Sequence, residues 1–154
     1  MRWRECLLMS LMIFPWMVPG QSSSPKDAVL GTWRGTSICT KVPGNEACRD
    51  ENVIYEFRSK GGRNDFVTLK GDKVVNDKIV PMYEIECTYD AKQNRWISEF
   101  QNSRVHILWS YVVHDSTITG TCVDLPSKVV RRNVVVHKVQ ANRLSASGVH
   151  SETR

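Results

Sequence analysis

The sequence has no uninterrupted apolar run of about 18 residues, which a membrane-spanning helix requires. Its basic residues are scattered, so the clustered Lys and Arg with stacking aromatics of nucleic-acid surfaces are missing. It contains no G-x-S-x-G, P-loop, H-E-x-x-H or G-x-G-x-x-G motif. No two cysteines lie at the two-to-four-residue spacing of zinc ligands. We therefore expect a non-enzymatic protein without metal, cofactor, nucleic-acid partner or stable membrane span.

What remains is a chain of one domain's length. Its 154 residues carry a net charge of +5, with 24% charged and 41% hydrophobic residues. These values are ordinary for a globular domain, which argues against wholesale disorder or a repeat array. Neither composition nor charge indicates an oligomeric state.

The first 20 residues resemble a secretory signal peptide. Arg2 and Arg4 provide a basic start, and residues 6–18 form a 13-residue stretch interrupted only by the polar Ser10. Signal-peptide apolar regions run about 7–15 residues, and Pro15 would break a longer helix. We expect cleavage and a secreted or periplasmic protein; the alternatives are a retained membrane anchor or a buried N-terminal helix.

The rest of the chain is expected to divide into three parts. Residues 21–28 are polar and predict a linker, and residues 29–140 predict a β-barrel domain. Residues 141–154 contain few apolar side chains and predict a flexible tail.

Four cysteines follow the expected cleavage point, and an even number in an exported chain favours disulfides over a metal site. Cys39 and Cys48 flank a turn-rich segment, so a bridge between them would pin a long hairpin loop. Four cysteines allow three pairings, and the sequence leaves the connectivity open; Cys87 and Cys122 lie in strand-like runs, where a bridge between them would join neighbouring strands.

The body of the chain is rich in β-formers. Between Pro25 and Gln140 it has 17 Val, 7 Ile and 8 Thr against 4 Leu and 3 Ala. This bias favours strands over helices. Residues 105–113 alternate, with Val105, Ile107, Trp109, Tyr111 and Val113 forming a wholly apolar face.

Turn signals divide this body into eight or nine short strands and leave no convincing helix. The strands are expected near 30–41, 52–58, 65–70, 73–76, 79–89, 95–100, 104–114, 117–125 and 129–139. Short strands joined by tight turns predict an all-β antiparallel meander. It would remove its exposed edges by closing into an up-and-down barrel of about eight strands, or by folding into a β-sandwich.

The run Gly31-Thr32-Trp33, placed before this meander, resembles the G-x-W that opens the first strand of calycin barrels, the lipocalin and avidin-like families. The resemblance implies a lipocalin-like barrel with Trp33 plugging one end. It also implies that a basic residue of the last strand covers that tryptophan, namely Arg131, Arg132 or Lys138. Small exported bacterial proteins of unknown function are also similar to two parts of this domain: the run Gly31–Cys39 followed by Cys48–Glu51, and the run Gly120–Pro126 followed by Arg132.

Titratable groups do not converge in the predicted sheet. His106 and His114 lie on the face opposite the apolar one, about 27 Å apart at about 3.4 Å per residue, too far to share a metal. Glu84 and Glu86 share a strand face opposite Ile85 and are expected to form a charged outer surface, with Glu56 or Glu99 as neighbours across strands.

The aromatic residues are the better functional candidates. Those expected to face inward and bind a ligand are Trp33, Tyr55, Phe57, Trp96, Trp109 and Tyr111, with Phe100 beside them. An eight-stranded barrel either fills its interior with side chains or holds one small ligand. We expect non-catalytic binding of a small apolar molecule in the barrel interior. The alternative is a filled barrel that acts as a protein- or envelope-interaction module through outer loops, especially Asn45, Glu46, Arg49 and Asp50.

Overall fold

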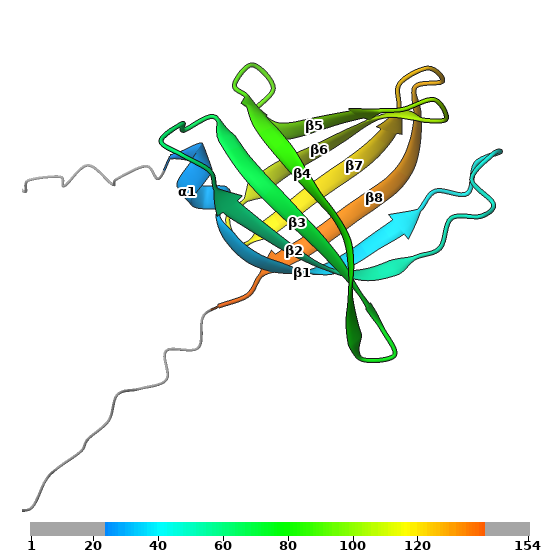
Figure 1. The fold of residues 1–154 in the computed structure, drawn as a ribbon, viewed down its shortest axis with the longest axis horizontal. Helices are drawn as coiled ribbons and strands as arrows, with labels where there is room; N and C mark the ends of the chain where they lie inside the picture. Colours follow the sequence, from blue (N-terminus) through cyan, green and yellow to red (C-terminus); the bar gives the residue numbers. More distant parts are fainter. Residues whose placement is uncertain (1–23, 141–154) are drawn as a thin grey trace, which may run out of the picture.

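The computed structural model describes residues 24–140 as a closed eight-stranded barrel preceded by a short helix (Figure 1). The expected signal peptide and flexible tail lie outside the described residues. The elements are α1 (Pro25–Val29), β1 (Gly31–Cys39), β2 (Glu51–Ser59), β3 (Phe66–Val75), β4 (Lys78–Asp90), β5 (Arg95–Gln101), β6 (His106–His114), β7 (Thr117–Asp124) and β8 (Val129–Lys138). No helix in this part of the chain is long and apolar enough to cross a membrane.

Every strand pairs antiparallel with its neighbour along the chain, and β1 closes the barrel on β8, where Trp33 lies opposite Lys138. This confirms the up-and-down barrel and rules out the sandwich. Alternation explains the arrangement, because every second side chain enters the core. The buried side chains include Trp33, Tyr55, Leu69, Tyr111 and Val136.

The predicted strands 65–70 and 73–76 are one continuous strand, β3. Gly71 and Asp72, read from the sequence as a turn, lie inside it. A Cβ on Gly71 would lie 2.6 Å from the ring of Tyr83 on β4, so the glycine admits a close aromatic neighbour. The turn lies instead at Asn76 and Asp77, whose positive φ angles of 49° and 61° suit a two-residue hairpin.

Helix α1 was not expected, since residues 25–28 were assigned to the polar linker. Its N-terminus is capped by Ser24, whose side chain accepts a hydrogen bond from the Asp27 amide. The helix is fixed by burial of Val29 and by Lys26, whose Nζ donates to Arg63 O at 2.6 Å. So short a helix carries little periodicity in the sequence, and its stability comes from these tertiary contacts.

Candidate functional site

One end of the barrel is closed by α1 and Trp33. The indole is fully buried, and its Nε1 donates to Val29 O at 2.8 Å. Lys138 covers the ring, with Nζ 5.1 Å from the ring centroid, and donates to Ala28 O at 3.1 Å. Of the three basic residues of the last strand, Lys138 is therefore the one that covers the tryptophan. This end is a packed plug held by hydrogen bonds and a cation–π contact.

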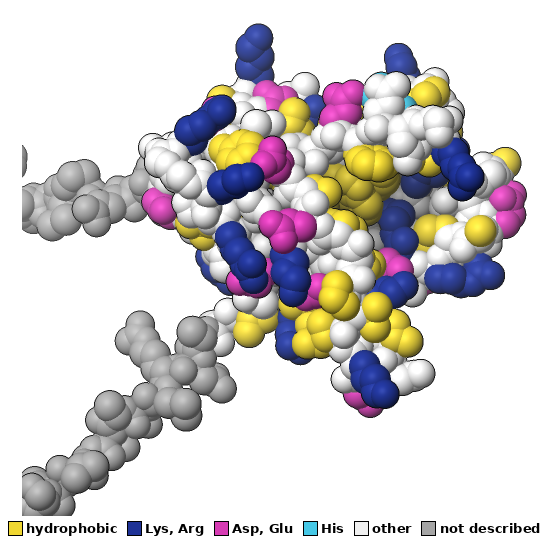
Figure 2. Space-filling model, viewed as in Figure 1, with side chains coloured by type: hydrophobic (Ala, Val, Ile, Leu, Met, Phe, Trp, Pro, Cys, Tyr) yellow, Lys and Arg dark blue, Asp and Glu magenta, His cyan; other side chains and the backbone are white. Residues whose placement is uncertain are grey.

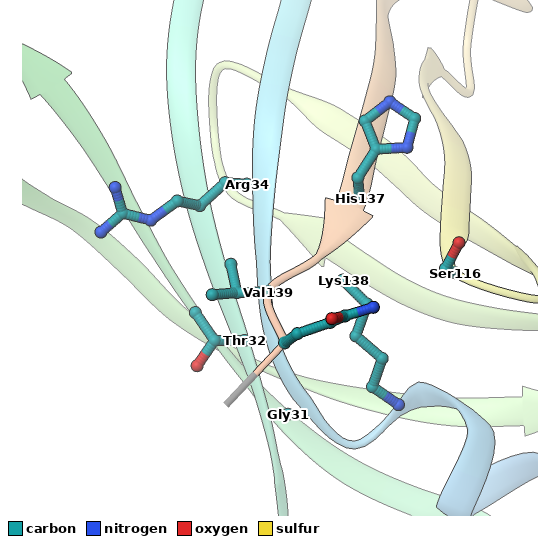
Figure 3. A pocket seen from close by; sticks show the side chains of 8 residues that line it. Gly31, Thr32, Arg34, Ser116, His137, Lys138 and Val139 are labelled. Atoms are coloured by element: carbon teal, nitrogen blue, oxygen red, sulfur yellow. The ribbon is translucent and has the colours of Figure 1, made fainter. Parts of the chain in front are cut away.

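A shallow hollow of about 740 Å³ lies outside the barrel beside this plug (Figure 3). It is lined by backbone and mostly polar side chains, including Arg34, Ser116 and His137, and Lys138 bends away from it toward α1. The hollow contains no aromatic side chain, and none of the predicted ligand-binding residues reaches it.

At the distal end, opposite the plug, one side of the barrel interior is apolar and the other side is charged. On the side of β4, β5 and β6 it carries an apolar cleft of about 460 Å³, lined by Tyr83, Glu84, Ile85, Phe100, Ile107 and Trp109. Figure 2 shows hydrophobic side chains gathered in the hollow on this face of the molecule. We call this the aromatic cleft. Its volume lies in the range of small-molecule sites.

Stacked aromatic rings connect the aromatic cleft to the core. The rings of Trp109 and Tyr111 are stacked with centroids 6.1 Å apart, and Tyr83 lies 6.2 Å from Trp109. Tyr55 contacts both tyrosines, at 6.0 Å from Tyr111 and 6.3 Å from Tyr83. The three phenols therefore form one continuous layer, in which Tyr83 lines the cleft and Tyr55 and Tyr111 lie beneath it.

Two of these phenols have buried hydroxyls without a hydrogen-bond partner among the described residues, those of Tyr83 and Tyr111. Desolvation is the main cause that raises the pKa of both groups, so they stay protonated and able to donate. An unpaired buried hydroxyl costs about 1–3 kcal/mol. A ligand group or a water in the cleft would recover this cost at Tyr83, which lines the cleft.

The side of the distal end formed by β8, β1 and β2 is charged. The guanidinium of Arg132 donates to Ser37 Oγ at 2.9 Å and to Glu51 Oε2 at 2.9 Å. It also donates to the carbonyl of Arg49 at 2.6 Å. Lys73 approaches Glu51 Oε1 at 3.4 Å, so two cations share one carboxylate.

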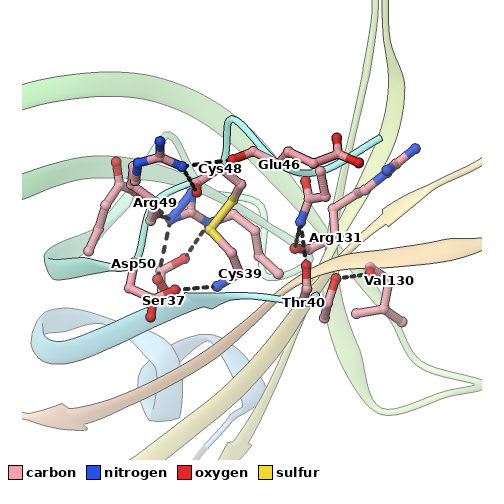
Figure 4. The surroundings of a disulfide bond; sticks show 12 residues. Ser37, Cys39, Thr40, Glu46, Cys48, Arg49, Asp50, Val130 and Arg131 are labelled. Atoms are coloured by element: carbon pink, nitrogen blue, oxygen red, sulfur yellow. Dashed lines mark hydrogen bonds and ion pairs between the residues drawn. A yellow bond between two sulfur atoms is a disulfide. The ribbon is translucent and has the colours of Figure 1, made fainter. Parts of the chain in front are cut away.

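The Cys39–Cys48 disulfide forms as predicted and closes the β1–β2 loop. The loop is also tied to β8, because the side-chain amide of Asn45 donates to Arg131 O at 2.9 Å. Arg49 donates to Glu46 O, and Asp50 accepts from the Cys39 amide (Figure 4). The side chains proposed to contact a partner thus form hydrogen bonds within the loop or to β8.

The predicted bridge between Cys87 and Cys122 is wrong. Both cysteines are buried free thiols, and they lie on β4 and β7, which are not neighbouring strands. The alternating pattern placed both side chains inside but did not reveal strand neighbours. Desolvation raises the pKa of Cys87 to about 12 and of Cys122 to about 11, so both are neutral, poorly nucleophilic core residues.

These thiols give a direct chemical prediction. The native protein should weigh two hydrogens less than its fully reduced chain, and iodoacetamide at pH 8 should label neither thiol until guanidinium unfolds the chain. Because both folded-state pKa values lie above the unfolded value, the stabilisation from neutral burial is complete below about pH 8.5 and is lost as pH rises toward 11–12. A native mass four hydrogens below that of the fully reduced chain would indicate a second disulfide and would contradict the free state of Cys87 and Cys122.

Of the six predicted ligand-binding residues, Trp109 alone lines the aromatic cleft. Tyr55 and Tyr111 form the layer beneath it, while Trp33 and Phe57 are fully packed at 0% and 2% exposure. Trp96 borders a separate space of about 180 Å³ next to α1. Phe100 lines the cleft and is 45% exposed rather than enclosed.

Sequence reasoning missed Tyr83, Ile85 and Ile107 as lining residues. Their alternation with polar residues predicts an inward strand face, but nothing in the sequence indicates which strands separate and leave space between them.

Among residues 24–140, no group of three or more His, Cys, Asp or Glu side chains is placed to hold a metal ion. His106 pairs with Glu99 across β5 and β6, and His114 is exposed at the end of β6. No protein-family model, curated protein or solved structure matches the chain.

Proposed function

We propose that this protein is a non-catalytic barrel of an oxidising compartment that binds a small, largely apolar molecule in the aromatic cleft. The observation that carries the proposal is the cleft itself: about 460 Å³ between β4, β5 and β6, with an apolar lining and Trp109 partly exposed inside it. The hydroxyl of Tyr83, which lines the cleft and has no hydrogen-bond partner among the described residues, supplies the kind of polar group that orients a ligand in such sites.

The resemblance of Gly31–Trp33 to the opening of calycin barrels implies a barrel with Trp33 plugging one end, which leaves the distal end as the place for a ligand. The Cys39–Cys48 disulfide supports export to an oxidising compartment. The loop-based interaction role receives less support, since Asn45, Glu46 and Arg49 are engaged by the loop's own backbone or by β8.

The test uses N-phenyl-1-naphthylamine, a neutral apolar dye whose emission rises on leaving water. The wild-type domain should bind it with saturable fluorescence, and Trp109→Ala should weaken binding about 30-fold, the effect of losing about 2 kcal/mol of aromatic contact. Val135→Ala is the matched control, because Val135 is an exposed apolar residue on β8 that does not line the cleft. Equal weakening in both variants, or no saturable binding, would refute the proposal.

A further inference from the structure

The barrel wall has a gap in its strand pairing between β4 and β5, which we call the seam. These strands pair only at Thr88–Ile97, Tyr89–Trp96 and Asp90–Arg95, next to the turn that joins them. Figure 1 shows the two strands diverging from that turn toward the distal end. β4 has 13 residues and stays paired with β3 on its other side, so most of its length presents a free edge to the seam.

The hydrogen-bonding pattern shows which groups point into the seam. The amide of Tyr89 donates to Asp65 O at 2.9 Å, on the β3 side. Because alternate residues of an antiparallel strand direct their backbone groups to opposite sides, Cys87 and Ile85 also face β3. The N–H and C=O groups of Glu84 and Glu86 therefore face the seam, where no strand of the described chain pairs with them.

Acidic side chains lie on both edges of the seam. Continuing the Thr88–Ile97 register by two residues would place Glu86 directly opposite Glu99. Like charges directly opposite each other destabilise a strand pair. Both side chains are on the outer face, at 60% and 58% exposure. A continued ladder would thus bring these two carboxylates together, at a cost to its stability.

The seam also has two chemically different faces. The inner face is the aromatic cleft, with Ile85, Phe100 and Trp109. The outer face carries three carboxylates, those of Glu84, Glu86 and Glu99, on a protein whose net charge is +5. Lys60 pairs with Glu86 and His106 with Glu99, while Glu84 makes no ion pair with any described residue. The seam therefore carries carboxylates on its outer rim over an apolar cleft, and Lys70, the β3 residue in register with Glu84, pairs with Asp72.

We propose that an extended peptide segment with alternating basic and apolar residues binds this seam as an added strand on β4. Its main chain pairs with the free backbone groups of Glu84 and Glu86, as in other cases of strand addition to a sheet edge. Because strand side chains alternate, residues opposite these two glutamates lie on the acidic outer face, and the residues between them enter the aromatic cleft. Pro81 has no N–H to donate and limits the pairing on the distal side.

The probe is the capped peptide acetyl-Lys-Leu-Lys-Leu-Lys-amide, titrated into the ¹⁵N-labelled domain. Binding should shift the amide signals of Glu84, Glu86 and Glu99 and slow hydrogen exchange at Glu84 and Glu86 at least tenfold. Peptide shifts confined to residues outside β4 and β5 would overturn the proposal.

Two changes separate backbone pairing from general attraction. Glu86→Pro removes one seam-facing N–H without touching the β3 ladder, and it should weaken peptide binding at least tenfold relative to Glu86→Ala, which loses the carboxylate alone. N-methylation of the central lysine of the peptide should do the same on the wild-type protein, which keeps the test valid if the proline variant does not fold. Unchanged affinity in both cases would overturn the proposal.

The charge contribution has its own matched pair. Glu86→Lys should weaken peptide binding several-fold, whereas Glu56→Lys, an equal charge change on the outer face of β2, should have little effect on it.

A second copy of the chain is the competing occupant of the seam. If light scattering shows a dimer whose formation protects the Glu84 and Glu86 amides from exchange, the seam serves self-association and the peptide proposal fails. Dye binding by Glu86→Pro should remain as in wild type, so failure of the peptide proposal leaves the small-molecule proposal standing.

Discussion

Replacing Trp33 by alanine should lower the free energy of unfolding by about 3–5 kcal/mol, the usual cost of deleting a large buried aromatic side chain. The indole is fully buried beneath α1 and Lys138, so the cavity that the substitution leaves is closed to solvent and water cannot readily fill it. The change also leaves Val29 O without the donor that now lies at 2.8 Å. Guanidinium unfolding followed by far-UV circular dichroism measures the loss.

Trp33→Phe is the informative companion variant. It retains most of the buried ring but cannot donate to Val29 O, so it should lose about 1–3 kcal/mol, the cost of an unpaired buried acceptor plus some lost volume. If the alanine variant were destabilised by less than the phenylalanine variant, Trp33 would not act as a packed plug.

Replacing Arg132 by alanine should have the second-largest effect on stability, about 3 kcal/mol, by removing one partner of a largely buried ion pair. The Arg132 and Glu51 side chains are 16% and 21% exposed, so solvent screens their interaction only in part. The variant leaves Glu51, Ser37 Oγ and the Arg49 carbonyl without the donor they share. Chemical unfolding at low and moderate salt provides the measurement.

Two further variants identify the cause. Arg34→Ala removes an exposed arginine from the outer face of β1 and should change stability by less than about 0.5 kcal/mol. Arg132→Lys keeps the charge but lacks the planar fork that reaches three acceptors, so it should recover only part of the loss. Full recovery by lysine would mean that charge alone matters at this position.

Periodicity made the strands and the direction of their side chains predictable. The apolar face of residues 105–113 does turn inward at Tyr111, and Glu84 and Glu86 do lie on the outer face. Strand number was less certain, because Gly71-Asp72 has the composition of a turn although its glycine instead makes room for Tyr83. Local sequence cannot distinguish these two uses of glycine.

The position of the aromatic cleft depends on which strands pair and on where their pairing ends, and the sequence of a single strand does not indicate either. The cleft lies where β4 and β5 separate after three residue pairs, and the alternation within neither strand indicates where that pairing ends. Cys87 and Cys122 failed as a predicted bridge for the same reason, since strand neighbours are set by topology rather than by alternation.

The closure of β1 on β8 has a consequence for the order of folding events. Seven of the eight strand pairings join consecutive strands and need only short chain segments to meet, whereas this one brings Trp33 to Lys138. The loop entropy of that encounter must be overcome before any of its contacts forms, and such non-local pairing slows folding. We expect the hairpins to form early and the pairing of β1 with β8 to set the folding rate. The Trp33–Lys138 contact then belongs to the last step, and its loss should accelerate unfolding more than it slows refolding.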